Sequence, residues 1–204
     1  MRRVSRDEYS ASLTKGSLKP QQVRTLAILL NEGHSPIEAV EKIIAENLFQ
    51  MRSSESARTL VNYQLRRLST VTPCLIEVSA TGTFREITQA SLVAALSESK
   101  LLRSFFFFIE TNMRSGGRRF LAPSDWASFV DWLEGQDPSV ARWTPTSLSK
   151  LRQNIWRILA ESEVTDNTKN MRLQSVRLEP RVRKCLEDPY YHEVNKTLEA
   201  GGFE

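Results

Sequence analysis

Signals that start α-helices recur along the whole chain and leave few segments free to form strands. The clearest are Pro20, the capping box Ser35-Pro-Ile-Glu38, a second capping box from Thr83 to Glu86, and Thr144-Pro145. A Ser or Thr before a helix can cap its free N–H groups, and Pro suits the first helical position. We therefore predict a mainly α, multi-helical fold, with helices over about 20–30, 36–47, 54–69, 83–97, 98–114, 124–134, 145–162 and 180–187.

The densest apolar stretch is LLRSFFFFI, residues 101–109. At 100° per residue its apolar side chains cover most of the helix circumference, and only Phe107 points away from the rest. A membrane-spanning helix needs about 20 apolar residues, so this segment is predicted to be a core helix.

The sequence pattern changes after Val164. TDNTKN, residues 165–170, is rich in turn formers, and MRLQSVRLEP, residues 171–180, alternates roughly between apolar and polar residues. This pattern predicts a small C-terminal β-hairpin. A second change, TVTP at 70–73, resembles a linker, so we predict two domains, residues 1–72 and 73–204.

Basic residues are distributed unevenly. Residues 1–72 and 142–184 carry net charges of +4 and +6, whereas residues 73–141 carry −2. Of the 28 basic residues 20 are Arg, which suits bidentate contacts with phosphates. Either two solvated basic surfaces or contact with an acidic partner would explain this distribution.

The segment 144–159, TPTSLSKLRQNIWRIL, is predicted to form a helix with one face free of carboxylates. Its core side carries Leu148, Leu151, Ile155, Ile158 and Leu159. Its exposed row consists of Thr146, Ser149, Lys150, Gln153 and Arg157. Such side chains hydrogen-bond phosphates or base edges and neutralise phosphates.

A short helix before this segment and a hairpin after it would give the order of a winged helix-turn-helix, with Lys169, Arg172 and Arg177 on the wing. The connection of ten residues before Pro145 is long for that motif. A solvated face in an all-helical bundle is the alternative.

A second helix-turn-helix candidate lies in the N-terminal segment. On the helix over 54–69, the residues expected to face outward are Thr59, Asn62, Tyr63 and Arg66, flanked by Arg58 and Arg67. The loop SGGRRF, residues 115–120, adds Arg118 and Arg119, which could hold a phosphate beside backbone N–H groups. It lacks the Walker pattern, and a Gly-Gly pair is more often a simple turn.

Few residues suit catalysis or metal binding. His34 and His192 have no metal-ligand neighbours at useful spacing, and Asp125 is expected on a solvated helix face with Asp131 and Glu134. No cofactor is expected. Cys74 and Cys185, 111 positions apart, are interpreted as separate buried residues of a reduced, cytosolic protein. MRRVSRDEYS, residues 1–10, has no apolar core of a secretory signal.

Four stretches give the sequence a family resemblance: YSASLTKGSL (9–18), AENLFQMRSSESARTL (45–60), RRL (66–68) and RWTPTSLSKLRQNIWRIL (142–159). With these, the chain resembles the BrxA family of bacteriophage-exclusion (BREX) defence systems. The resemblance implies a mostly helical protein that binds double-stranded DNA without chemistry of its own. It would act beside a methyltransferase, an ATPase and a phosphatase-like protein. The compact SGGRRF loop departs from the longer polar connection expected there.

Together these features predict a non-catalytic protein that binds double-stranded DNA, mainly through phosphates and with little sequence preference. An adaptor with acidic protein partners is the first alternative. A repressor of the defence operon is the second, and a metal-dependent nuclease is the third.

Overall fold

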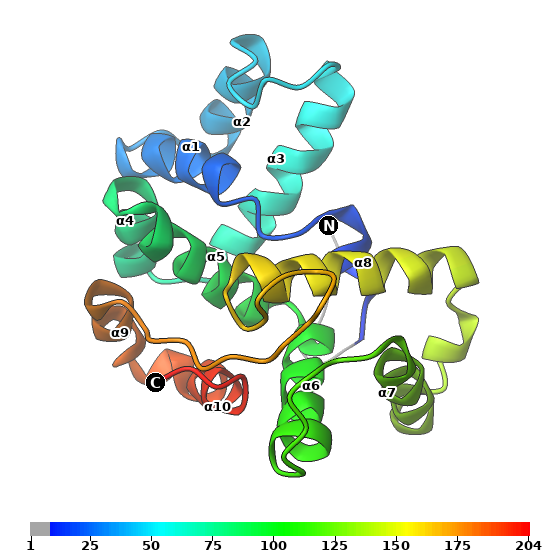
Figure 1. Ribbon diagram of the computed structural model, residues 1–204. Coiled ribbons are helices and arrows are strands. Elements are labelled where there is room, and N and C mark those ends of the chain that lie inside the picture. Colours follow the sequence, from blue (N-terminus) through cyan, green and yellow to red (C-terminus); the bar gives the residue numbers. More distant parts are fainter. Residues whose placement is uncertain (1–8) are drawn as a thin grey trace. The chain divides into compact units, whose positions relative to one another are not determined.

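The computed structural model describes residues 9–204; residues 1–8, to which most of the prediction about a secretory signal refers, lie outside them. The described part contains ten α-helices, three short 3-10 helices and one π-helical turn (Figure 1). The α-helices are α1 (Pro20–Asn31), α2 (Pro36–Ala45), α3 (Ser54–Leu68), α4 (Pro73–Thr81), α5 (Phe84–Glu98), α6 (Lys100–Ile109), α7 (Pro123–Gln136), α8 (Pro145–Glu161), α9 (Pro180–Leu186) and α10 (His192–Ala200). The others are η1 (Ala11–Lys15), η2 (Glu110–Arg114), η3 (Val140–Arg142) and η4 (Pro189–Tyr191).

The predicted helix starts are confirmed by their capping contacts. Ser35 Oγ accepts the N–H of Glu38 at 3.3 Å, and the Glu38 carboxylate accepts the N–H of Ser35 at 2.7 Å. Thr83 and Glu86 form the same reciprocal pair at 3.3 and 2.7 Å. These local hydrogen bonds satisfy N–H groups that a helix leaves open at its start.

Two helices of the structure were not predicted from the sequence. Pro73, assigned to a linker, is the first residue of α4, with Thr72 at the preceding cap position. The C-terminal segment 192–204 contains α10, which begins at His192. Pro suits both a linker and the first turn of a helix, so that residue alone does not distinguish the two.

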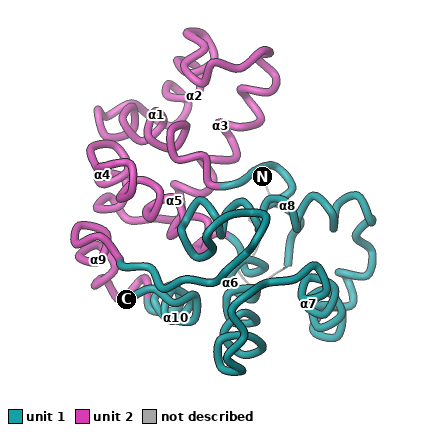
Figure 2. The backbone as a smooth tube through the Cα atoms, viewed as in Figure 1, with its two compact units in different colours: residues 1–17, 99–177, 192–204 teal, residues 18–98, 178–191 magenta. Residues whose placement is uncertain are grey.

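The chain divides into two compact units that interleave along the sequence (Figure 2). Among the described residues, unit 1 contains 9–17, 99–177 and 192–204, and unit 2 contains 18–98 and 178–191. The units do not coincide with the two segments, 1–72 and 73–204, that the sequence suggested as domains. That domain division stays a prediction.

The predicted C-terminal β-hairpin is wrong, and with it the wing of a winged helix. Within residues 9–204 there is no strand, only isolated bridges: Thr165 with Leu173, Phe120 with Arg172, and Val176 with Phe203. The alternating residues pair with three different segments, one residue at a time, so no continuous ladder forms. The fold of the described residues is mainly α, as predicted.

The two cysteines form a disulfide, so the interpretation of two separate reduced residues is wrong. Cys74 in the first turn of α4 is bonded to Cys185 in α9, with their Cα atoms 5.7 Å apart. Both helices belong to unit 2 and pack against each other. A separation of 111 residues along the chain therefore says nothing about their distance in space.

An aromatic cluster forms part of the core of unit 1 and joins α6, α7 and α8. Phe105 of α6 contacts Phe129 and Trp126 of α7 and Trp156 of α8, with ring centroids 4.8 to 6.0 Å apart. Phe107 is exposed, as predicted. α6 is therefore a core helix, and none of the described helices is long and apolar enough to cross a membrane.

The C-terminal segment packs against α6 and η2. Arg114 Nη2 donates to the carbonyls of Gln174 and Gly201 at 2.7 and 2.8 Å. A Cβ atom on Gly201 would lie 2.5 Å from the ring of Phe106, which is fully buried. Gly201 is thus required by the close approach of the tail to α6.

Replacing Gly201 by Ala is expected to lower the free energy of unfolding by about 1–3 kcal/mol, because the added methyl group overpacks a rigid aromatic contact. Gly135→Ala is the matched control, since a Cβ atom there meets open space within α7. That change should be neutral or stabilising by up to about 1 kcal/mol. Urea unfolding of both variants checks the difference, and equal stabilities would contradict the packing at Gly201.

Candidate nucleic-acid interface

The exposed row of α8 is built by a helix with a buried side and a capped start. Thr144 Oγ1 accepts the N–H of Ser147 at 3.2 Å, and Pro145 follows at the first helical position. The buried side consists of Leu151, Asn154, Ile155, Ile158 and Leu159. All five residues of the predicted row are exposed, namely Thr146, Ser149, Lys150, Gln153 and Arg157.

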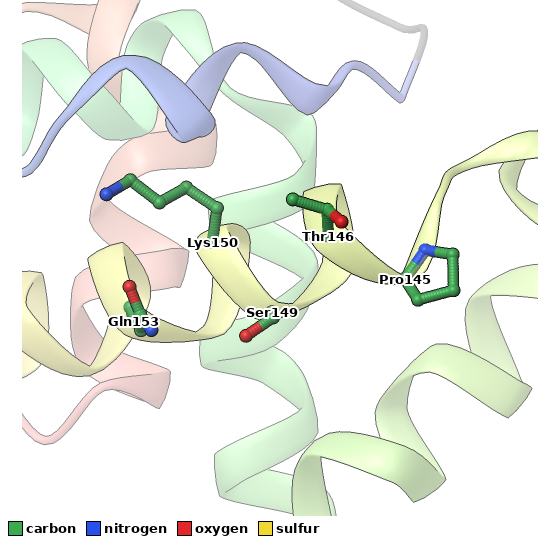
Figure 3. A pocket seen from close by; sticks show the side chains of 5 residues that line it. All are labelled: Pro145, Thr146, Ser149, Lys150 and Gln153. Carbon is green, nitrogen blue, oxygen red and sulfur yellow. The ribbon is translucent and has the colours of Figure 1, made fainter.

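Four residues of this row line a shared hollow. The hollow has a volume of about 540 Å³ and is lined by Pro145, Thr146, Ser149, Lys150 and Gln153. Figure 3 shows these side chains projecting from the first turns of α8. The row therefore forms one continuous surface of hydroxyl, amide and ammonium groups.

The charge of the row is not neutralised by nearby carboxylates. Within residues 9–204, no ion pair joins Lys150 or Arg157 to an acidic side chain. The first turn of α8 contains no acidic residue. Glu161, in the last turn, accepts a hydrogen bond from Ser17 Oγ at 2.8 Å.

Lys169 and Arg172 are exposed on a loop rather than on a wing. Asp166 accepts the N–H groups of Asn167 and Arg172, and Asn167 Oδ1 accepts those of Lys169 and Asn170, all at 2.8–2.9 Å. Partial desolvation raises the pKa of Asp166, but the hydrogen bonds from Arg172 and Asn167 outweigh it and hold the pKa below its usual value. The loop is therefore tied to its own acceptors and leaves Lys169 exposed.

The two arginines of SGGRRF have different surroundings. Arg118 pairs in a bidentate manner with the carboxylate of Asp125, at 2.8 and 3.0 Å. Asp125, expected on a solvated face, is buried and also accepts the N–H of Ala122. Arg119 is exposed, and within residues 9–204 no carboxylate pairs with it. Because Phe120 bridges Arg172, Arg119 lies close to the 166–172 loop in the fold.

Three backbone N–H groups of SGGRRF are already used within the chain. The N–H groups of Ser115, Gly117 and Arg118 donate to carbonyls of the preceding turn. The phosphate-binding role suggested for this loop stays a prediction, and Arg119 is its cation without a carboxylate partner among the described residues.

The α3 candidate in unit 2 is smaller than the sequence suggested. Arg58, Thr59 and Asn62 are exposed, as expected. Arg66 is partly buried and pairs with Glu98 at 3.0 Å. Arg67 is only 1 % exposed, so it is not available to a ligand.

Arg67 packs on Tyr63 one helical turn earlier, and both side chains are buried. Its guanidinium lies 4.2 Å from the ring centroid and donates to the Tyr63 hydroxyl. Tyr63 was expected outside, and its burial raises the pKa of its hydroxyl. A helix wheel places residues by angle alone and cannot anticipate that a neighbouring segment covers this side of α3.

Neither candidate is preceded by a short turn. The connection from α7 to α8 and that from α2 to α3 each contain eight residues. The helix-turn-helix arrangement stays a prediction. Within residues 9–204, no group of three or more His, Cys, Asp or Glu residues is arranged to hold a metal ion.

Comparisons with known proteins give one consistent family. The family model described as BrxA matches residues 7–189. A protein from Paramagnetospirillum magneticum named BREX protein BrxA is 29 % identical over 185 residues, covering 91 % of this chain and 93 % of the relative. Proteins of the same name from Bacillus cereus and Escherichia coli O9:H4 are 28 % and 26 % identical, over 83 % and 88 % of this chain and 84 % of each relative.

A solved structure has the same fold as this chain. It is described as an uncharacterized protein from Magnetospirillum magneticum and is 28 % identical to this chain. The two structures superimpose with a TM-score of 0.83, covering 94 % of this chain and 98 % of the other. With a family model that spans nearly the whole sequence and relatives of matching length, the chain belongs to the BrxA family.

Proposed function

We propose that this protein is a non-catalytic component of a BREX phage-defence system that binds double-stranded DNA. The observation that carries the proposal is the exposed row of α8, which joins two unpaired cations to Thr, Ser and Gln side chains on one surface. Hydroxyl and amide groups bond to phosphate oxygens, and cations displace the counterions of DNA.

The cations of unit 1 extend this surface beyond one helix. The exposed ones without a carboxylate partner among the described residues are Lys150, Arg157, Arg119 and Lys169. Arg172 is also exposed, beside the carboxylate of Asp166. If they contact phosphates, the affinity depends steeply on salt but weakly on sequence. A slope of log K against log salt between about −2 and −4.5 is expected for two to five such contacts.

The α3 face of unit 2 is proposed as a second contact. Arg58, Thr59 and Asn62 supply the same chemistry there on a smaller scale. We further propose that the protein acts in the cytoplasm beside other BREX proteins. These are the methyltransferase, ATPase and phosphatase-like components that the family resemblance implies. The place beside other BREX proteins is supported by the names of the relatives, each a BREX protein.

The test is fluorescence anisotropy of the full chain with labelled duplexes of unrelated sequence across a salt series. We expect binding to all duplexes with similar affinity and the slope given above. Absence of binding even at low salt would overturn the proposal and favour a protein adaptor. A strong preference for the promoter of its own operon would favour a repressor instead, and magnesium-dependent cleavage of the duplex would favour a nuclease.

A further inference from the structure

We propose that the N-terminal strap, residues 9–17, forms part of the DNA-binding surface, with Lys15 as an additional phosphate contact. The inference rests on the proposed function and extends it to a segment that the helix patterns did not assign. The strap contains η1, and η1 packs against α8 within unit 1.

Two hydrogen bonds hold the strap along α8. Asn154 Nδ2 donates to the carbonyl of Leu13 at 2.7 Å, and Ser17 Oγ donates to Glu161 at 2.8 Å. Asn154 is 4 % exposed, although its position on the helix wheel is at the border of the polar face. Leu13 and Ser17 are fully buried, so the strap is a packed part of unit 1.

The start of the strap is held by α6. The hydroxyls of Tyr9 and Ser104 are hydrogen-bonded at 3.1 Å, and the ammonium of Lys100 lies 4.4 Å from the centroid of the Tyr9 ring. The strap is therefore anchored near both ends. A pre-ordered segment loses less conformational entropy on binding than a free arm does.

The two α8 anchors place the backbone of the strap beside one stripe of α8. Lys150, Asn154, Arg157 and Glu161 are spaced by four, three and four residues, so they share one stripe of the helix. Leu13 is hydrogen-bonded to Asn154, and Ser17 is hydrogen-bonded to Glu161. Arg157 lies between Asn154 and Glu161 on this stripe, so the residues between Leu13 and Ser17 pass beside it. Figure 3 shows the N-terminal ribbon, in blue, beside α8 near Lys150. Lys15 thus extends the row that contains Lys150 and Arg157.

The chemistry of the strap matches that of the row. Residues 9–17, YSASLTKGS, contain one Lys, four Ser or Thr and no carboxylate. Lys15 is exposed, and within residues 9–204 no acidic side chain pairs with it. The strap also engages Glu161, the single carboxylate of α8, through Ser17. A polyanion such as the DNA backbone is the partner that fits this combined surface.

The test is Lys15→Ala in the full chain, measured by anisotropy with duplex DNA across the same salt series. Loss of one phosphate contact should make the salt slope shallower by about 0.9 and weaken binding about fivefold at 0.15 M salt. Lys184→Ala is the matched control, because Lys184 is exposed on α9 in unit 2. Lys15→Arg should keep the wild-type slope, and all three variants should melt at the wild-type temperature.

The outcomes separate this inference from the proposed function. If the wild type binds DNA but Lys15→Ala keeps the wild-type slope and affinity, the strap is not a contact and the inference is overturned, while the α8 proposal stands. The same holds if Lys184→Ala weakens binding as much as Lys15→Ala. If the wild type does not bind duplex DNA at low salt, both fail.

Discussion

Replacing Lys150 and Arg157 together by glutamate is expected to weaken duplex binding about 30-fold or more at 0.15 M salt, because two phosphate contacts are lost. The loss should be the same for unrelated sequences, since phosphates carry no sequence information directly. Anisotropy titrations with several duplexes measure the effect. The salt slope should become shallower by about 1.8.

A control with the same change in charge separates a local contact from net charge. Arg183→Glu with Lys184→Glu reverses two exposed cations on α9, and should leave the affinity within a fewfold of the wild type. Circular dichroism melting checks that both double variants are folded. A folded Lys150/Arg157 variant that binds DNA as tightly as the wild type would refute the role of α8.

Removing the disulfide by Cys74→Ala with Cys185→Ala is expected to lower the free energy of unfolding by about 2–4 kcal/mol. The bond joins residues 111 positions apart, so it restricts the unfolded chain strongly. Denaturant unfolding of the whole chain, monitored by circular dichroism, measures the change in the free energy of unfolding.

Reduction of the wild type provides an independent comparison. With a thiol reductant, the wild type should lose about as much stability as the double alanine variant, and the variant should not respond to the reductant. Titration of thiols in the unreduced protein under denaturing conditions should find none. Two reactive thiols there, or equal stability of the oxidised and reduced wild type, would contradict the bond.

Local sequence signals predicted the helices because the contacts that start a helix are local. Ser35 with Glu38 and Thr83 with Glu86 cap their helices through residues three positions apart. The exposed row of α8 was predicted for the same reason, since a 3.6-residue period separates its buried side from its polar side. Pro73 shows the limit of such signals, because Pro suits both a linker and a helix start.

Contacts that helix periodicity does not encode decided the features that the helix patterns missed. Arg67 was predicted to be exposed, but it packs on Tyr63 in a covered part of unit 2, and both are buried. Arg118 was predicted to be open to a phosphate, but the buried carboxylate of Asp125 pairs with it. Residues 171–176 alternate as a strand would, yet they meet three separate segments instead of one partner strand.

By itself, the sequence determined that this protein is mainly helical and that α8 carries an exposed row without carboxylates, because both follow from spacing within about one or two helical turns. Only the tertiary structure decided that Cys74 meets Cys185, that Arg67 is buried and that the strap lies along α8. Those three features depend on pairs of segments that are far apart in the chain or on the neighbours that cover a helix. Local periodicity contains no information about which distant segment packs against a given side of a helix.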